Sequence, residues 1–176
     1  MKKKFCVVMG LVMLLSICFP HYTYPNSLKD QPFLATINDE IIYNFVISTP
    51  FSINQQDILP FDKEMGFICH PGDKNTVECP IQNLSTKTND TITMQFDQND
   101  KLISILYIQA IDYSYSSYYN LKYDHFIEYF NNKFMLTPSK LGDTEFLWIN
   151  SSEVALFSSK KMNDIYVMTI FRTVAR

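Results

Sequence analysis

Two histidines are the side chains of this chain best suited to acid–base or metal chemistry. His125 follows Asp124 and stands three residues before Glu128, and a His-x-x-Glu pair can place two metal ligands on one helix face. A metal centre needs more ligands, and the sequence contains no second pair of this kind, so we expect no metal or cofactor. His70 could act as a general base, but no nucleophile stands at a recognisable catalytic spacing from it.

Carboxylates offer a second route to hydrolysis. Asp112, Glu145 and Glu153 could supply the paired acids that glycoside hydrolysis requires. A chain with 18 acidic residues contains such sets by chance, so the pattern does not favour an enzyme. A small secreted hydrolase that uses His70 or His125 remains the alternative hypothesis.

The segment 111–120 has the least ordinary composition in the chain, with four tyrosines and three serines in ten residues. Tyrosine gives a binding surface a large, rigid contact area, and serine gives it adaptable hydrogen bonds. We therefore predict a binding site at Tyr113, Tyr115, Tyr118 and Tyr119, for a protein or a glycan. The alternative is structural: the first two tyrosines extend an apolar strand face, and the last two begin a helix.

Cys69 and Cys79 enclose a segment rich in turn-forming residues. The other two cysteines, Cys6 and Cys18, belong to the first 25 residues. In an oxidising compartment the first pair is expected to form a disulfide across the base of a hairpin or loop. Closing such an 11-residue loop stabilises a fold by about 2.5 to 3 kcal/mol in the chain-entropy model.

The N-terminal residues 1–25 have the pattern of a secretory signal peptide. Three lysines precede an uncharged run over residues 5–19, which Pro20 ends. As a helix this run would be about 22 Å long, too short for a hydrocarbon core of about 30 Å. We expect cleavage, leaving 26–176 as one exported domain, secreted or periplasmic. An uncleaved or lipid-anchored N-terminus is the alternative, because residues 15–18 loosely resemble a lipoprotein box, although Ile17 is not small.

The net charge of the expected mature chain disfavours some classes of binding partner. Loss of the three leader lysines from 15 basic residues leaves 12 against 18 acidic residues, a formal charge of −6. Such a chain gains little from the counterion release that drives nucleic-acid binding. It also lacks the polybasic segment that would hold it on an anionic membrane. We therefore expect no nucleic-acid partner and no stable membrane span after cleavage.

The order of the elements indicates an α+β fold. We predict strands at 41–48, 91–96, 102–111, 144–149, 153–158 and 165–174, and a short helix at 55–59. A turn is expected at 97–100 and a polar loop at 83–90. The apolar residues Tyr123, Phe126, Ile127, Phe130 and Phe134 form one stripe of a helix at 118–135, with Ser116 or Ser117 as its N-cap.

These elements predict an antiparallel sheet of about five to seven strands with the long helix packed on one face and a disulfide-stapled loop. The strand at 102–111 is apolar on both faces, which predicts a central strand covered on each side. The leading hypothesis is an exported, non-enzymatic protein that binds another macromolecule through the Tyr/Ser segment. A second alternative to the hydrolase is an envelope-tethered accessory protein with an uncleaved N-terminus.

Overall fold

The computed structural model describes residues 36–37, 39–58, 69–73, 75–83 and 88–175. The expected signal peptide and its cleavage region lie outside the described residues. Seven strands of four or more residues and two of two residues form one sheet in the described part of the chain. They are β1 (Thr36–Ile37), β2 (His70–Pro71), β3 (Thr76–Asn83), β4 (Thr88–Phe96), β5 (Leu102–Asp112), β6 (Ser139–Gly142), β7 (Glu145–Ile149), β8 (Glu153–Met162) and β9 (Ile165–Val174).

The strand order is β1-β3-β4-β5-β9-β8-β7-β6, with β2 paired to β3 outside this path. Every pairing is antiparallel except that of β1 with β3. The predicted antiparallel α+β fold is confirmed, and the last three strands, β7, β8 and β9, pair in sequence order as an antiparallel meander. Strand β5 is central, between β4 and β9. The turn between β4 and β5 is closed by a hydrogen bond from the N–H of Asp100 to the carbonyl of Asp97, and Asp100 has a φ of 64°.

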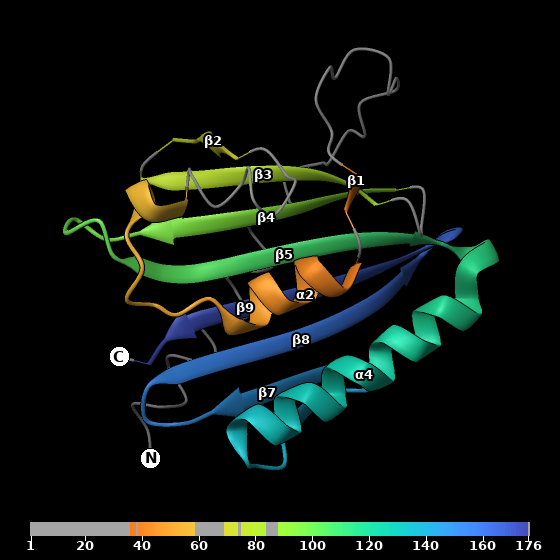
Figure 1. The fold of residues 1–176 in the computed structure, drawn as a ribbon. Coiled ribbons are helices and arrows are strands. Elements are labelled where there is room, and N and C mark those ends of the chain that lie inside the picture. The colour runs from red at the N-terminus through yellow and green to blue at the C-terminus, as the bar shows by residue number, and fades with distance from the viewer. Residues whose placement is uncertain (1–35, 38, 59–68, 74, 84–87, 176) are drawn as a thin grey trace. The chain divides into compact units, whose positions relative to one another are not determined.

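The long helix α4 (Ser116–Phe134) packs on one face of the sheet (Figure 1). Its buried stripe is the predicted one: the ring of Phe126 lies 5.7 Å from Phe157, and that of Phe130 lies 5.1 Å from Trp148. The predicted serine cap is wrong. The N-cap residue is Tyr115, which makes no side-chain cap hydrogen bond, because a 3-10 helix, η2 (Tyr113–Tyr115), leads directly into α4.

The segment expected to be a strand at 41–48 is a helix, α2 (Asp39–Ser48). Its β-branched and aromatic residues favour a strand by composition. Within the helix, buried Ile42, Phe45 and Val46 are spaced as in the helical repeat, and Ile47 is buried beside them. Asn44 and Ser48 are exposed, four residues apart on the opposite side. A short apolar run fits both periods, and packing on the sheet beside α4 decides for the helix (Figure 1).

A buried ionic cluster holds the C-terminal end of α2 against the sheet. Arg172 donates from Nη1 to the carbonyl of Val46 at 2.5 Å and from Nε to Glu153 at 2.5 Å. Lys133, on α4, donates to Glu153 at 3.0 Å and to the carbonyl of Ile47 at 2.9 Å. Burial lowers the pKa of Lys133. Cations favour a helix C-terminus, where carbonyl groups lack partners, so this cluster joins α2, α4 and two strands.

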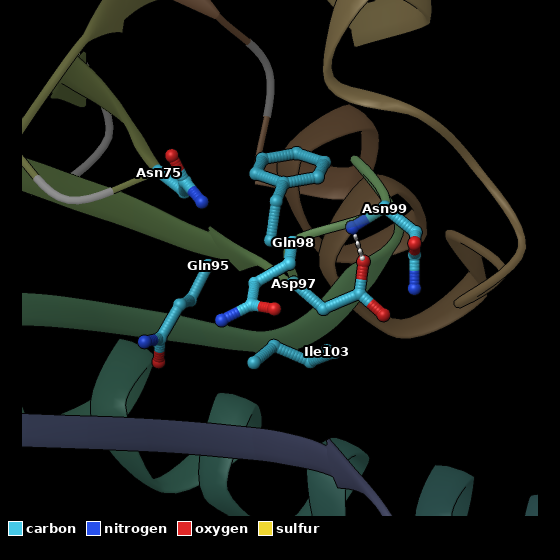
Figure 2. A pocket seen from close by; sticks show the side chains of 7 residues that line it. Asn75, Gln95, Asp97, Gln98, Asn99 and Ile103 are labelled. Atoms are coloured by element: carbon cyan, nitrogen blue, oxygen red, sulfur yellow. Dashed lines mark hydrogen bonds between the residues drawn. The ribbon is translucent and has the colours of Figure 1, made fainter.

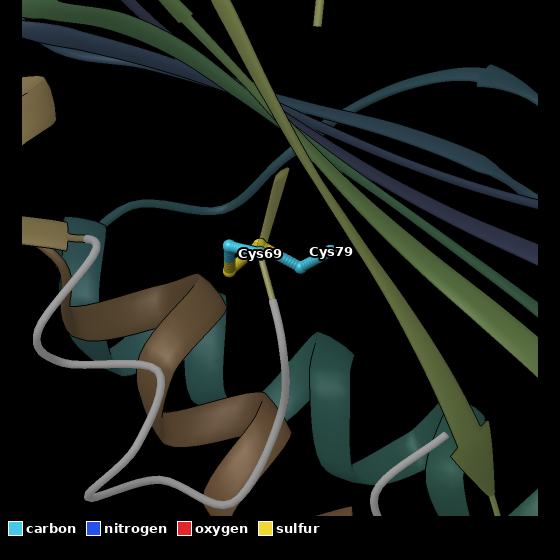
Figure 3. The surroundings of a disulfide bond; sticks show 2 residues. All are labelled: Cys69 and Cys79. Atoms are coloured by element: carbon cyan, nitrogen blue, oxygen red, sulfur yellow. A yellow bond between two sulfur atoms is a disulfide. The ribbon is translucent and has the colours of Figure 1, made fainter. Parts of the chain in front are cut away.

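The predicted disulfide is present. Strand β2 pairs with β3 through His70 and Glu78, and the bond between Cys69 and Cys79 lies directly beyond that pair (Figure 3). It therefore staples the base of a hairpin, as the cysteine spacing predicts. Both cysteines are buried among the core residues.

Three further predictions need correction or limits. The polar loop expected at 83–90 is shorter, because β3 continues to Asn83 and β4 begins at Thr88. The short helix is described over 55–58, and Leu59 lies outside the described residues. Both α2 and α4 lie on the same face of the sheet, with α2 over its middle and α4 over its β7–β8 side (Figure 1). On its other face Leu106 and Ile108 of β5 are half-buried, so the helices cover one side rather than each side.

Candidate binding surface around Tyr113

The Tyr/Ser segment forms the junction between the central strand and the long helix. Asp112 ends β5, and its carboxylate accepts hydrogen bonds from the hydroxyl and the backbone N–H of Ser114. These two bonds lower the pKa of Asp112 and cap η2. The backbone N–H of Tyr113 donates to the carbonyl of Asp164 at 2.8 Å, which ties the segment to the β8–β9 turn. The junction is therefore held by hydrogen bonds to Asp112 at the end of β5 and to Asp164 in the β8–β9 turn.

Three tyrosines stack at this junction. The ring of Tyr166, on β9, lies 3.9 Å from that of Tyr119 with an interplanar angle of 13°. Its distance from the ring of Tyr113 is 5.6 Å, with an angle of 25°. The hydroxyl of Tyr119 is 2.5 Å from that of Ser159, on β8. Stacked aromatic pairs stabilise by about 0.5 to 1.5 kcal/mol beyond the area that they bury.

A lysine completes the arrangement. The Nζ atom of Lys161 lies 3.9 Å from the ring centroid of Tyr113 and 6.0 Å from that of Tyr166. The attraction of an ammonium group for an aromatic face is about 0.5 to 1 kcal/mol at an exposed site. We call Tyr113, Tyr119, Lys161 and Tyr166 together the Tyr113 surface.

The four predicted tyrosines have different environments. Tyr113 is 47% exposed, whereas Tyr119, which stacks on Tyr166, is half-buried. Tyr115 is half-buried against the hydrophobic core. Tyr118 belongs to α4, but its side chain lies outside the described residues. The structure thus joins Tyr113 and Tyr119 through Tyr166 and packs Tyr115 inward.

Sequence reasoning missed Tyr166 and Lys161. The sheet brings them to the surface because Ile111 pairs with Tyr166, which in turn pairs with Lys161. Ile111, Tyr166 and Lys161 therefore lie in one row across β5, β9 and β8. Ile111 is the first residue of the Tyr/Ser segment. The predicted strands at 153–158 and 165–174 leave Lys161 between them, whereas β8 continues to Met162 and so places Lys161 beside Tyr166. Tyr113 lies close to this pair because β5, which leads directly into η2, pairs with β9.

Four of the residues considered for hydrolysis, namely His70, His125, Glu153 and Asp112, have structural or exposed environments, and Asp112 is the one that adjoins the Tyr113 surface. His70, on β2, and His125, on α4, are exposed, and neither imidazole makes a hydrogen bond with a described residue. Glu153 is paired with Arg172 and Lys133, and Asp112 caps η2. Within the described ranges no group of three or more His, Cys, Asp and Glu side chains could hold a metal ion.

In the described part of the chain, no helix has both the length and the apolar character needed to cross a membrane.

Comparisons with protein-family models, with curated proteins and with solved structures find no match for this chain. Its function must therefore be argued from its own residues. The Tyr113 surface combines a partly exposed tyrosine, a cation over its ring and a backbone held by hydrogen bonds, which is an arrangement suited to binding.

Proposed function

We propose that this chain is an exported, non-enzymatic protein that binds another macromolecule through the Tyr113 surface, in the periplasm or outside the cell. The observation that carries the proposal is the exposure of Tyr113 on a stack that holds it from below. The basic, then apolar N-terminal pattern supports export. The disulfide agrees with an oxidising compartment.

A rigid aromatic side chain loses little conformational freedom when a partner covers it. Tyr113 is held by its backbone bond to Asp164, by the ring of Tyr166 and by Lys161. Interface energy concentrates in a few such anchors, and tyrosine is among the most frequent. A protein or a glycan partner could contact the exposed part of the same side chain, and the proposal places that contact on Tyr113 rather than on half-buried Tyr115.

The test compares capture of a partner from extract by the exported protein and its variants, with the thermal stability of each variant measured in parallel. Tyr113→Ala should weaken binding of a specific partner by about 2 kcal/mol or more. Loss of its stacking on Tyr166 and of its contact with Lys161 should lower stability by about 1 to 2.5 kcal/mol, which leaves the protein folded. Leu121→Ala is the matched control, because Leu121 is 67% exposed on α4 outside the stack. It should leave both measurements unchanged.

Tyr119→Ala should lower stability, because it removes a stacked ring and the hydrogen bond to Ser159. Equal loss of capture by Tyr113→Ala and Leu121→Ala would contradict the proposal. The hydrolase alternative is tested by His70→Ala and His125→Ala: loss of an activity or phenotype in a folded protein would favour it over a binding protein. An envelope-tethered form would instead show an uncleaved N-terminus.

A further inference from the structure

A shallow hollow of about 430 Å³ lies where the β2–β3 turn meets the β4–β5 turn (Figure 2). The backbone N–H of Phe96 donates to the carbonyl of Asn75 at 2.9 Å, which ties the two turns together. The second turn is closed by a bond from the N–H of Asp97 to the carbonyl of Lys101 at 2.8 Å. The walls of the hollow are therefore held by backbone bonds. It lies at the opposite end of β5 from Tyr113.

Amide side chains dominate the lining. Figure 2 shows the lining residues, which come from the two turns and from the adjoining ends of β4 and β5: Asn75, Gln95, Phe96, Asp97, Gln98, Asn99 and Ile103. The side-chain amides of Asn75, Gln95 and Gln98 make no hydrogen bond with a described residue. Oδ1 of Asp97 accepts from the backbone N–H groups of Asn99 and Lys101, at 2.8 and 3.0 Å.

The lining disfavours ions of either sign. Asp97 is the only charged residue among the described lining residues, and its carboxylate would repel a phosphate or another anion. A calcium ion needs six to eight oxygen ligands, usually with several carboxylates, and this turn lacks the glycine and the distal glutamate of a calcium loop. The cation of Lys101 is directed elsewhere, donating to the carbonyl of Ser52 at 3.0 Å.

Amides suit neutral hydroxyl groups. Each amide presents donors and an acceptor side by side, whereas each hydroxyl both donates and accepts. Neighbouring hydroxyls on a sugar ring can therefore pair with one amide. The half-buried Ile103 offers an apolar contact for the C–H groups of such a ring. The volume falls within the range of about 300 to 1,000 Å³ that is usual for small-molecule sites.

We propose that this hollow binds a neutral, hydroxyl-rich ligand of the size of a mono- or disaccharide. The site is separate from the Tyr113 surface, because the two lie at opposite ends of β5. The proposal therefore does not depend on a macromolecular partner.

The test is NMR titration of the isotopically labelled exported protein, read on its side-chain amide signals. The probes are maltose, cellobiose and N,N′-diacetylchitobiose, with calcium chloride and inorganic phosphate as ionic probes. At least one disaccharide should shift the Gln95 and Gln98 signals saturably, with a Kd of about 1 mM or tighter. Gln95→Ala and Gln98→Ala should each weaken that binding by about tenfold. Both residues are exposed, so the fold should persist.

Asn132→Ala is the matched control, because it removes an exposed amide from α4. It should leave disaccharide binding unchanged, and so should Tyr113→Ala. The proposal is overturned if no disaccharide shifts the two glutamine signals. It is also overturned if only calcium or phosphate shifts them, or if Asn132→Ala weakens binding as much as the glutamine variants do.

Discussion

Among the aromatic residues at the strand–helix junction, Tyr113 is exposed while its ring is supported from below. Tyr166 and Lys161 contact its ring, and the carbonyl of Asp164 fixes its backbone. Tyr115 and Tyr119, which follow it in the same segment, are half-buried. Packing thus gives the three tyrosines whose side chains are described different roles: Tyr113 is exposed, Tyr119 belongs to the stack, and Tyr115 packs against the core. This division is what makes Tyr113 the residue to test.

Composition could predict that this segment is unusual but not which ring is accessible. The residues that support Tyr113 come from β8 and β9, and Tyr119 and Tyr166 are 47 positions apart in the printed sequence. Their contact depends on the register of β5 with β9. A single sequence predicts strands and turns locally, but it does not fix the register between strands that are far apart in the chain.

Glu153 is predicted to be essential for stability rather than for hydrolysis. Glu153→Ala would leave the cations of Arg172 and Lys133 without their anion, and Arg172 is only 2% exposed. We expect the free energy of unfolding to fall by about 3 to 5 kcal/mol, measured by urea unfolding. Glu128→Ala, an exposed change on α4, is the control. A loss below about 1 kcal/mol for Glu153→Ala would show that the cluster contributes little.

Asp97 should make stability depend on pH in acid. The backbone N–H of Lys101, followed by hydrogen bonds from Asn99, lowers the pKa of Asp97. A lowered pKa in the folded state gives stability that is present above the ordinary value of about 4 and lost as the pH falls through the folded value. Asp97→Asn should therefore show a weaker loss of stability below about pH 4, measured as Tm against pH. An acid limb as steep as that of the parent would contradict this.

Among the larger structural units, α2 shows where local pattern is ambiguous. Its residues are rich in strand-forming types, yet the buried positions follow the helical repeat. The cations that stabilise its C-terminal end come from α4 and β9, since its own last turn has no basic residue. The sequence of the segment alone therefore lacks the information that selects the helix. By contrast, α4 is long enough for its apolar stripe to be unambiguous.

Two substitutions at Asn44 distinguish the helix from a strand. Asn44 is exposed within α2, so Asn44→Ala should stabilise the fold by about 0.5 kcal/mol through helix propensity. Asn44→Pro should destabilise it by about 3 kcal/mol, because it removes a helical hydrogen bond and clashes with the preceding turn. Both values can be measured by urea unfolding. A destabilising Asn44→Ala variant would argue against the helix.

The disulfide and the loop that it closes could be predicted, because the two cysteines and the turn residues are close in sequence, whereas the pairing of β2 with β3 could not. We expect the Cys69→Ser/Cys79→Ser double variant to lose about 2.5 to 3 kcal/mol of stability, the entropy of an 11-residue loop in the unfolded chain. Denaturant unfolding of the oxidised parent and the double variant provides the measurement. Two free thiols in the native exported protein would refute the disulfide itself.

For the molecule as a whole, composition, topology and the Tyr113 surface are consistent with the proposed function as an exported binding protein. The predicted leader supports the proposal of export, and its removal would leave a formal charge of −6, which would disfavour nucleic-acid binding. The sheet brings residues from β5, η2, α4, β8 and β9 into one supported surface. We expect the exported form to begin between Phe19 and Asn26, and its mass would report the cleavage and the disulfide together. A full-length chain in the membrane fraction after a high-salt wash would contradict cleavage.

The most direct test of binding through Tyr113 is site-specific photo-crosslinking of the exported protein in intact cells. A photoreactive phenylalanine analogue replaces Tyr113 in one protein and Leu121 in the other, two exposed positions of which only the first lies on the stack. The account predicts a crosslinked macromolecular partner from position 113 and none from position 121. Crosslinking from position 121 alone, or from neither position, would contradict the claim that the Tyr113 surface binds a partner.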